Sequence, residues 1–192
     1  GVPARVSNDL FDVLQKAQRV AELSEGAFDP TVGPYVRLWR RARRTQTLPS
    51  SEALAAAGEP AGYKKLRLDA RNRTVTLTVP NMQLDLGGIA KGYAADKALV
   101  ELKSRGVTCA LVAASGDIAA GDPPPGKPGW RVGIGTPDTA GNKLTRTILL
   151  RNAAVSTSGD AEQFVEINGT RYSHIVNPNT CIGLTERIQV SI

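Results

Sequence analysis

The sequence predicts an α+β fold in which mixed β-sheets are flanked by helices. Three observations predict it. Apolar residues recur at helical spacing in residues 7–24, alternating runs flank the dipeptide Asn168-Gly169, and a strand-like stretch passes into a glycine-rich helix start at residues 84–98. A chain of 192 residues can bury a sizeable core, and we interpret residues 1–192 as a single domain.

The first half of the chain is predicted to begin with helices. Ser7 should cap a helix over residues 7–24, and Gly26 should end it. The following segment, "AFDPTVGPYVRLWRRARR", indicates a structured turn that leads into a short helical or irregular piece. A further short helix is expected over residues 51–57, and alternation on both sides of "DARN" favours a hairpin within residues 64–79.

The central segment predicts a βαβ-like unit that would bind phosphate. Residues 82–88 are expected to form a strand, residues 89–105 a helix, and residues 107–114 a buried strand. After a proline- and glycine-rich loop, strands are expected over residues 130–137 and 144–158, followed by a hairpin within residues 163–176.

The composition excludes some classes of protein and leaves others open. No apolar stretch approaches the roughly 20 residues of a membrane-spanning helix. With one histidine and two cysteines, a zinc site of the usual type and a disulfide framework are both excluded. The net charge of +6 suits an anionic ligand, a nucleic acid or simple solubility. A nucleic-acid site would use the segment "RLWRRARR", with its arginines beside Trp39, but a solvated arginine-rich segment is the preferred interpretation and no nucleic-acid partner is predicted.

The glycine-rich helix start at residues 87–92 is the first candidate site. A helix N-terminus exposes unpaired N–H groups and a partial positive charge, which attract phosphate. Gly87, Gly88 and Gly92 would let a ligand approach the backbone, and Lys91 would add a full charge. The spacing fits neither a dinucleotide fingerprint nor a P-loop, so tight strand-to-helix packing is the alternative explanation.

Two further groups of small and polar residues lie at the ends of predicted strands. Ser115, Gly116 and Asp117 stand where sheets place ligands, and Asp117 could bind a ribose or ribityl hydroxyl, or simply lie in a turn. Ser158 with Gly159 could hold another polar group, or residues 157–160 could cap a turn.

His174 is expected on the second hairpin strand, where a lone histidine is more often structural than catalytic. Because neither Ser115 nor Ser158 lies in a G-x-S-x-G elbow, the sequence does not favour a serine hydrolase.

Five segments in order resemble the ApbE family of FAD:protein FMN transferases. They are "AFDPTVGPYVRLW", "LDLGGIAKGYAADKA", "ASGDIAAG", "STSGD" and "HIVNPNT". The resemblance implies a magnesium-dependent reaction in which FMN passes from FAD to a Thr or Ser hydroxyl of an acceptor protein and AMP leaves. Alternatives are an FAD-binding protein without transferase activity and an FAD pyrophosphatase. The resemblance also implies a periplasmic or inner-membrane-anchored protein.

The resemblance assigns roles to particular residues. His174 would be the catalytic base or would orient a phosphate, and the main-chain carbonyl of Gly88 would bind magnesium. The expected FAD-binding residues, including those proposed above from the strands alone, are Ala27, Phe28, Asp29, Asp85, Lys91, Ser115, Gly116, Asp117, Ser158 and Ile175.

The sequence departs from the family pattern in three places. Asn177 replaces the usual Asp and Cys181 the usual Gly in the loop after His174, which we expect to alter that loop. Parts of the family domain are expected to be missing before Gly1 and after Ile192, including side-chain ligands of the magnesium ion. The acceptor and the oligomeric state are not predicted.

Overall fold

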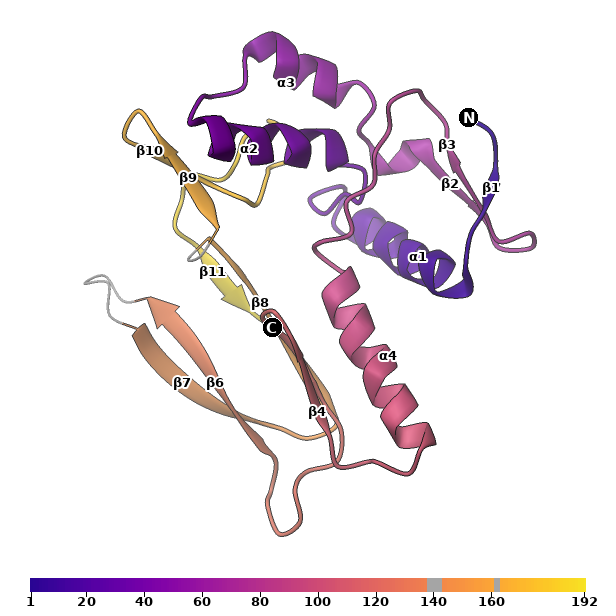
Figure 1. Cartoon of the computed structure of the whole chain (residues 1–192), viewed down its shortest axis with the longest axis vertical. Coiled ribbons are helices and arrows are strands. Elements are labelled where there is room, and N and C mark those ends of the chain that lie inside the picture. Colours follow the sequence, from indigo (N-terminus) through magenta and orange to yellow (C-terminus); the bar gives the residue numbers. More distant parts are fainter. Residues whose placement is uncertain (138–142, 161–162) are drawn as a thin grey trace. The chain divides into compact units, whose positions relative to one another are not determined.

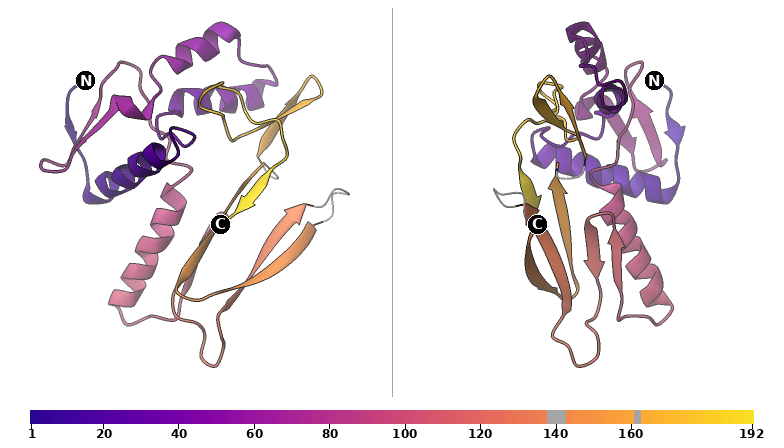
Figure 2. Two further views of the ribbon diagram at one scale, coloured as in Figure 1. Left: turned by 180° about the vertical axis from the view of Figure 1, so that it is seen from behind. Right: turned by 60° about the vertical axis from the view of Figure 1, so that its left-hand side comes forward.

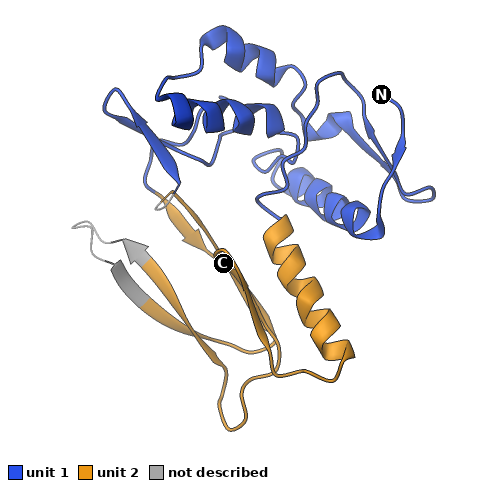
Figure 3. Ribbon diagram, in the orientation of Figure 1, with its two compact units in different colours: residues 1–89, 162–187 blue, residues 90–161, 188–192 orange. Residues whose placement is uncertain are grey.

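The computed structural model describes residues 1–137, 143–160 and 163–192 and divides into two compact units (Figures 1 and 3). Unit 1 comprises residues 1–89 and 162–187, and unit 2 comprises residues 90–161 and 188–192. Helices and several small sheets together confirm the predicted α+β class. Each unit has its own apolar core, and the assignment of residues 1–192 to a single domain stays a prediction.

Unit 1 is built from helices and two small sheets. In chain order its elements are β1 (Ala4–Arg5), α1 (Asn8–Leu23), α2 (Gly33–Thr45), α3 (Ser51–Gly58), the short 3-10 helix η1 (Tyr63–Lys65), β2 (Leu66–Asp69), β3 (Thr74–Leu77), β9 (Phe164–Ile167) and β10 (Thr170–Ser173).

The first core of unit 1 lies between α1 and the sheet of order β1-β3-β2. Ser7 caps α1 as predicted, because its hydroxyl accepts the Leu10 N–H at 3.2 Å, and Gly26 follows the helix with a positive φ of 87°. The apolar face of α1 packs on residues of β2, β3 and the segment after them. The buried members of this core are Phe11, Leu14, Leu66, Val75 and Met82.

A second core joins α2 to the β9–β10 hairpin. Trp39 and Ala42 face Val165 and Ile167, and the Trp39 ring lies 5.1 Å from that of Tyr172. The hairpin turns at Asn168-Gly169 as predicted, with positive φ at both residues. Because β10 ends at Ser173, His174 is the first residue after the strand rather than part of it.

Unit 2 packs one helix and a two-stranded ribbon with an antiparallel sheet. Its elements are α4 (Ala90–Ser104), β4 (Leu111–Ala114), β5 (Asp117–Ala120), β6 (Trp130–Pro137), β7 (Lys143–Leu150), β8 (Ala153–Gly159) and β11 (Gln189–Ser191). The sheet has the order β11-β8-β5-β4, and α4 contacts β4 and β5 (Figure 2). Ala120, Val132, Leu150 and Val155 form the core between the sheet and the β6–β7 ribbon.

The predicted βαβ unit is wrong in its first strand. Residues 82–88 form no strand; Gln83 makes only an isolated parallel bridge to Val32, and the Asp85 N–H donates to the Pro30 carbonyl at 2.8 Å. The segment beside them, residues 30–33, contains a proline and runs into α2, so no ladder can extend. After the helix, β4 pairs antiparallel with β5 instead of completing a parallel pair, and it is shorter and more exposed than predicted.

Across the described residues, every helix is too short or too polar to cross a membrane.

Candidate functional site

Asp29 holds the loop before α2 together from inside unit 1. Its side chain is buried at 9% exposure. One carboxylate oxygen accepts the Thr31 N–H at 2.7 Å and the Thr31 hydroxyl at 2.6 Å, and the other accepts the Tyr63 N–H at 2.9 Å. Thr31 in turn accepts the Gly62 N–H at 2.7 Å. The carboxylate predicted to line an FAD site is therefore engaged by the protein, whereas the neighbouring Ala27 is exposed.

Phe28 and Gly88, both predicted site residues, lie against each other. A Cβ atom added to Gly88 would stand 3.0 Å from the Phe28 ring, which is tighter than ordinary packing. The Phe28 ring therefore limits the side chain that position 88 can carry, although Gly88 itself is exposed. The main-chain carbonyl of Gly88 is the atom that the resemblance assigns to magnesium.

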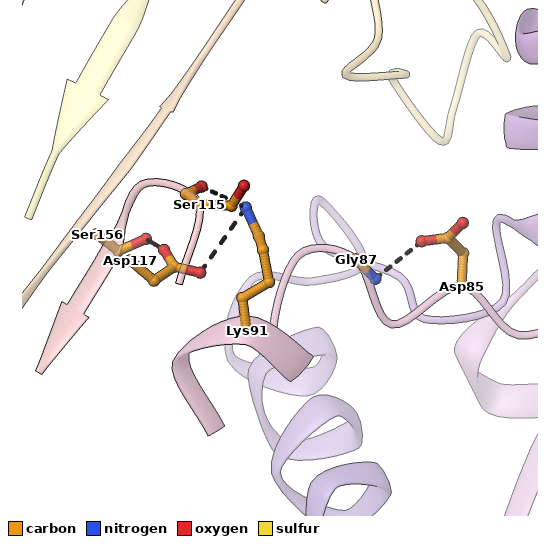
Figure 4. A network of polar contacts seen from close by, with 6 residues as sticks. All are labelled: Asp85, Gly87, Lys91, Ser115, Asp117 and Ser156. Atoms are coloured by element: carbon orange, nitrogen blue, oxygen red, sulfur yellow. Dashed lines mark hydrogen bonds and ion pairs between the residues drawn. The ribbon is translucent and has the colours of Figure 1, made fainter. Parts of the chain in front are cut away.

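Asp85 organises the turn that precedes Gly88. One of its carboxylate oxygens accepts the Gly87 N–H at 2.9 Å (Figure 4), and the other pairs with Arg40 of α2 at 3.3 Å. The side chain of Asp85 is 19% exposed and that of Arg40 is 77% exposed. Water screens such a pair, so it orients the carboxylate more than it stabilises the fold.

In unit 2, Lys91 reaches the turn between β4 and β5 (Figure 4). Its ammonium donates to the Ser115 carbonyl at 3.1 Å and lies 3.9 Å from an Asp117 carboxylate oxygen. Ser115 and Gly116 both have positive φ, 51° and 100°, as a two-residue type I′ hairpin turn requires. The structure therefore brings together Lys91 and the Ser115–Asp117 turn, which the sequence proposed as two separate candidate sites.

Ser156 is a member of this group that sequence reasoning missed. It pairs with Asp117 across β8 and β5, and its hydroxyl donates to the other Asp117 carboxylate oxygen. The predicted residue, Ser158, lies within β8, is exposed, and pairs with Val190 of β11. The expected turn cap at residues 157–160 is wrong, because residues 157–159 belong to β8. Only the register between β5 and β8 shows that Ser156 belongs to this group.

The His174 imidazole is oriented by a main-chain carbonyl within unit 1. Its Nδ1 lies 3.0 Å from the Gln163 carbonyl oxygen, which also accepts the His174 N–H at 3.1 Å. Because a carbonyl can only accept, Nδ1 carries the proton, and in the neutral ring Nε2 keeps a lone pair. The side chain is exposed. An oriented imidazole with an accessible lone pair can act as a general base.

The residue after His174 is anchored through its backbone. The Ile175 N–H donates to the hydroxyl of buried Ser173 at 3.0 Å, and its carbonyl accepts the Leu184 N–H at 2.9 Å. Ile175 itself is half-buried. The structure thus holds the chain rigidly beside the candidate base.

In the loop that follows, Asn177 acts as the acceptor that an Asp would provide. Its side-chain oxygen accepts the Asn179 N–H at 2.9 Å, and its carbonyl accepts the Cys181 N–H at 2.8 Å. Cys181 has a φ of 63°, in the left-handed region that favours glycine. Burial raises the pKa of the neighbouring Tyr35 well above its usual range, and a hydrogen bond with Cys181 adds to the shift.

A cavity of about 450 Å³ in unit 1 joins the loop around Asp29 to the loop after His174. Its lining residues come from the loop between α1 and α2, the first turn of α2, the α3–η1 region and the loop after His174. They are Glu25, Gly26, Asp29, Tyr35, Gly58, Ala61, Gly62, Tyr63, Lys64, Lys65, Pro178 and Asn179. Two predicted motifs distant in the sequence therefore meet at one cavity.

The described residues offer one assigned magnesium ligand, the Gly88 carbonyl, and one carboxylate close to it in sequence, that of Asp85. Magnesium prefers an octahedron of oxygen ligands, usually with one or two carboxylates plus waters or phosphates. In unit 1, Asp85 lies near the Gly88 carbonyl in sequence, but both of its oxygens already have partners. Within residues 1–137, 143–160 and 163–192, no group of three His, Cys, Asp or Glu side chains could hold a metal ion.

The geometry of α2 removes Trp39 from the nucleic-acid interpretation. All five arginines of the helix are exposed, which fits solvated side chains and phosphate contacts alike. Trp39 is only 5% exposed and its indole N–H donates to the Cys181 carbonyl at 2.9 Å. It is therefore not available to stack on a base.

Comparisons with known proteins agree on one family. The family model described as ApbE family matches residues 1–192. A Treponema pallidum protein named FAD:protein FMN transferase is 36% identical over 191 residues, and the match covers 93% of this chain and 53% of that protein. A Haemophilus influenzae protein of the same name is 34% identical over 184 residues, again covering 93% and 53%. The chain thus spans about half the length of these curated relatives.

Solved structures give the same result. An ApbE protein from Thermotoga maritima matches with a TM-score of 0.88 and 34% identity, covering all of this chain and 62% of that one. The flavin transferase ApbE from Vibrio cholerae matches with a TM-score of 0.88 and 32% identity, covering 99% and 60%.

Proposed function

Because the chain belongs to the ApbE family, we propose that it transfers FMN from FAD to a Ser or Thr hydroxyl of an acceptor protein and releases AMP. The names and structures of its relatives support this proposal. The chain covers about half of the curated relatives, so the activity of the whole protein is part of the proposal.

The observation that carries the chemistry is the oriented imidazole of His174. In the proposed step, the acceptor hydroxyl oxygen attacks the phosphorus of the FMN half of FAD. The bond from that phosphorus to the bridging oxygen breaks, and AMP leaves with the bridging oxygen. The Nε2 of His174 takes the hydroxyl proton, since the Gln163 carbonyl holds the ring in the tautomer that has a lone pair there.

The other residues of unit 1 would bind and orient the flavin nucleotide. The Phe28 ring lies against the backbone at Gly88 and would offer an apolar surface next to the Gly88 carbonyl. Ile175 would lie beside the cofactor. Phosphoryl transfer depends mostly on such placement and on charge stabilisation. The proposal also includes a magnesium ion with the Gly88 carbonyl as one ligand. It further includes export to the periplasm or anchoring at the inner membrane. Both rest on the resemblance alone.

The test is an assay of the purified chain with FAD and a threonine-containing acceptor protein, with and without magnesium. We expect AMP release and covalent FMN on the acceptor, detected by chromatography and mass spectrometry. His174→Ala should lower the transfer rate by about 100-fold or more while FAD still binds, the range typical of a general base. His174→Gln keeps a polar side chain without the base and should be equally slow.

Other outcomes would contradict the proposal. Transfer at the wild-type rate by His174→Ala would reject the base assignment. FAD binding without acceptor labelling would indicate a flavin-binding protein, and AMP release without labelling would indicate a pyrophosphatase.

A further inference from the structure

Lys91 is held by two neighbours before any ligand arrives (Figure 4). An ammonium group has three N–H donors. One points to the Ser115 carbonyl at 3.1 Å, and the Asp117 carboxylate lies 3.9 Å away, beyond hydrogen-bond distance but within ion-pair range. At least one donor therefore remains for an anionic ligand. The lysine side chain is 44% exposed, so such a ligand can reach it.

Asp117 is the fixed partner of this pair. Its side chain is only 13% exposed, and Ser156 on the neighbouring strand donates to its second carboxylate oxygen. The β5–β8 register places the two residues directly opposite each other. The tight Ser115-Gly116 turn fixes the carbonyl that receives the ammonium. The β5–β8 pair and the Ser115-Gly116 turn thus determine the position of the two groups that contact the Lys91 ammonium.

We infer that Asp117, oriented by Ser156, is a positioning residue for Lys91 and does not bind the sugar hydroxyls of FAD. This inference rests on the proposed function for the identity of the ligand, an FAD phosphate on the remaining ammonium donor. A lysine fixed beforehand loses less side-chain freedom when it binds the phosphate. The inference assigns Asp117 to Lys91 instead of to a ribose or ribityl hydroxyl, because one carboxylate oxygen accepts the Ser156 hydroxyl and the other is the oxygen nearest the ammonium.

A double-mutant cycle on FAD affinity tests the inference. The dissociation constant is measured by flavin fluorescence for wild type, Lys91→Ala, Ser156→Ala and the double variant. Ser156→Ala is the informative change because it removes the hydrogen bond that orients the Asp117 carboxylate and leaves its charge unaltered. We expect Ser156→Ala to weaken FAD binding about tenfold in the wild type and less than twofold when Lys91 is already absent, since coupled neighbours are not additive. Asp117→Asn should behave in the same way.

Two results of this cycle would overturn the inference. If Ser156→Ala weakened FAD binding equally with Lys91 present and with Lys91 replaced by alanine, Asp117 would bind FAD directly or act only through the fold. Tighter FAD binding by Asp117→Asn would mean that the carboxylate merely repels the phosphate. Glu101→Gln is the matched control, because Glu101 lies on the same helix as Lys91 and forms an exposed ion pair with Arg105, just after that helix. This change should leave FAD affinity unchanged.

A second measurement does not depend on FAD. Lysines are labelled by reductive ¹³C-methylation, and the Lys91 resonance is assigned by its absence in Lys91→Arg. We expect this resonance to shift in Asp117→Asn and Ser156→Ala but not in Glu101→Gln. An unchanged resonance in all three variants would overturn the positioning role. If the wild type fails to bind FAD while the shifts appear, the proposed function fails and the contact between Lys91 and Asp117 stands.

Discussion

Replacing Asp29 with alanine should strongly destabilise unit 1. The buried carboxylate accepts three hydrogen bonds, from the Thr31 N–H, the Thr31 hydroxyl and the Tyr63 N–H. Asp29→Ala leaves all three donors without this acceptor in a site that is only 9% exposed. The loop that joins α1 to α2 would then lose its hydrogen bond to Tyr63 of η1 and keep the one from the Gly62 N–H to the Thr31 hydroxyl.

The magnitude follows from the number of donors and their burial. A hydrogen bond to a charged group contributes about 1.5–3 kcal/mol, and a buried unpaired donor costs about 1–3 kcal/mol. Because the three bonds converge on one group, their effects overlap. We expect a loss of about 3–5 kcal/mol, a large fraction of the roughly 5–15 kcal/mol that stabilises a typical domain.

The assay is urea unfolding followed by tryptophan fluorescence in a Trp130→Phe background. Trp39, buried in unit 1, is then the only tryptophan and reports this unit alone. Asp69→Ala is the matched control, since Asp69 also accepts three hydrogen bonds, from Arg71 and Asn72, but is exposed to water. We expect the control to lose far less stability. If Asp29→Ala lost no more than Asp69→Ala, the argument from burial would be refuted.

Two further predictions concern single side chains. Gly92→Ala places a methyl group in α4 where nothing outside the helix's own backbone lies within 4 Å, so urea unfolding should show a gain of about 0.5–1 kcal/mol. If FAD lies close to the α4 backbone at residue 92, the added methyl group should also lower FAD affinity. Unchanged FAD affinity in Gly92→Ala would contradict that close contact. Tyr35→Phe should change the pH dependence of stability, because burial, and then Cys181, raises the pKa of Tyr35 in the folded state. Above about pH 10, the usual tyrosine pKa, the unfolded chain releases this proton first, so wild type should lose stability as the pH rises and Tyr35→Phe should lose less. Equal slopes for the two proteins between about pH 9 and pH 11 would refute the assigned shift.

The sequence alone predicted the elements whose signals are local. Ser7 caps α1, and Asn168-Gly169 turns the β9–β10 hairpin, because a side-chain hydroxyl and a pair of left-handed residues decide these features within a few positions. The glycine-rich helix start with Lys91 left a phosphate site and tight packing as alternatives. The role of His174 as a base came from the resemblance to the ApbE family, and both site assignments stay predictions.

Only the tertiary structure decided which of these groups bond to distant parts of the protein. Asp29 turns inward to η1, the predicted strand at residues 82–88 has no neighbour to pair with, and Ser156 reaches Asp117 across 39 positions of sequence. Each outcome depends on which segments pack side by side. Strand register and loop packing are set by contacts between distant residues, whereas helix caps and hairpin turns are set by the residues themselves.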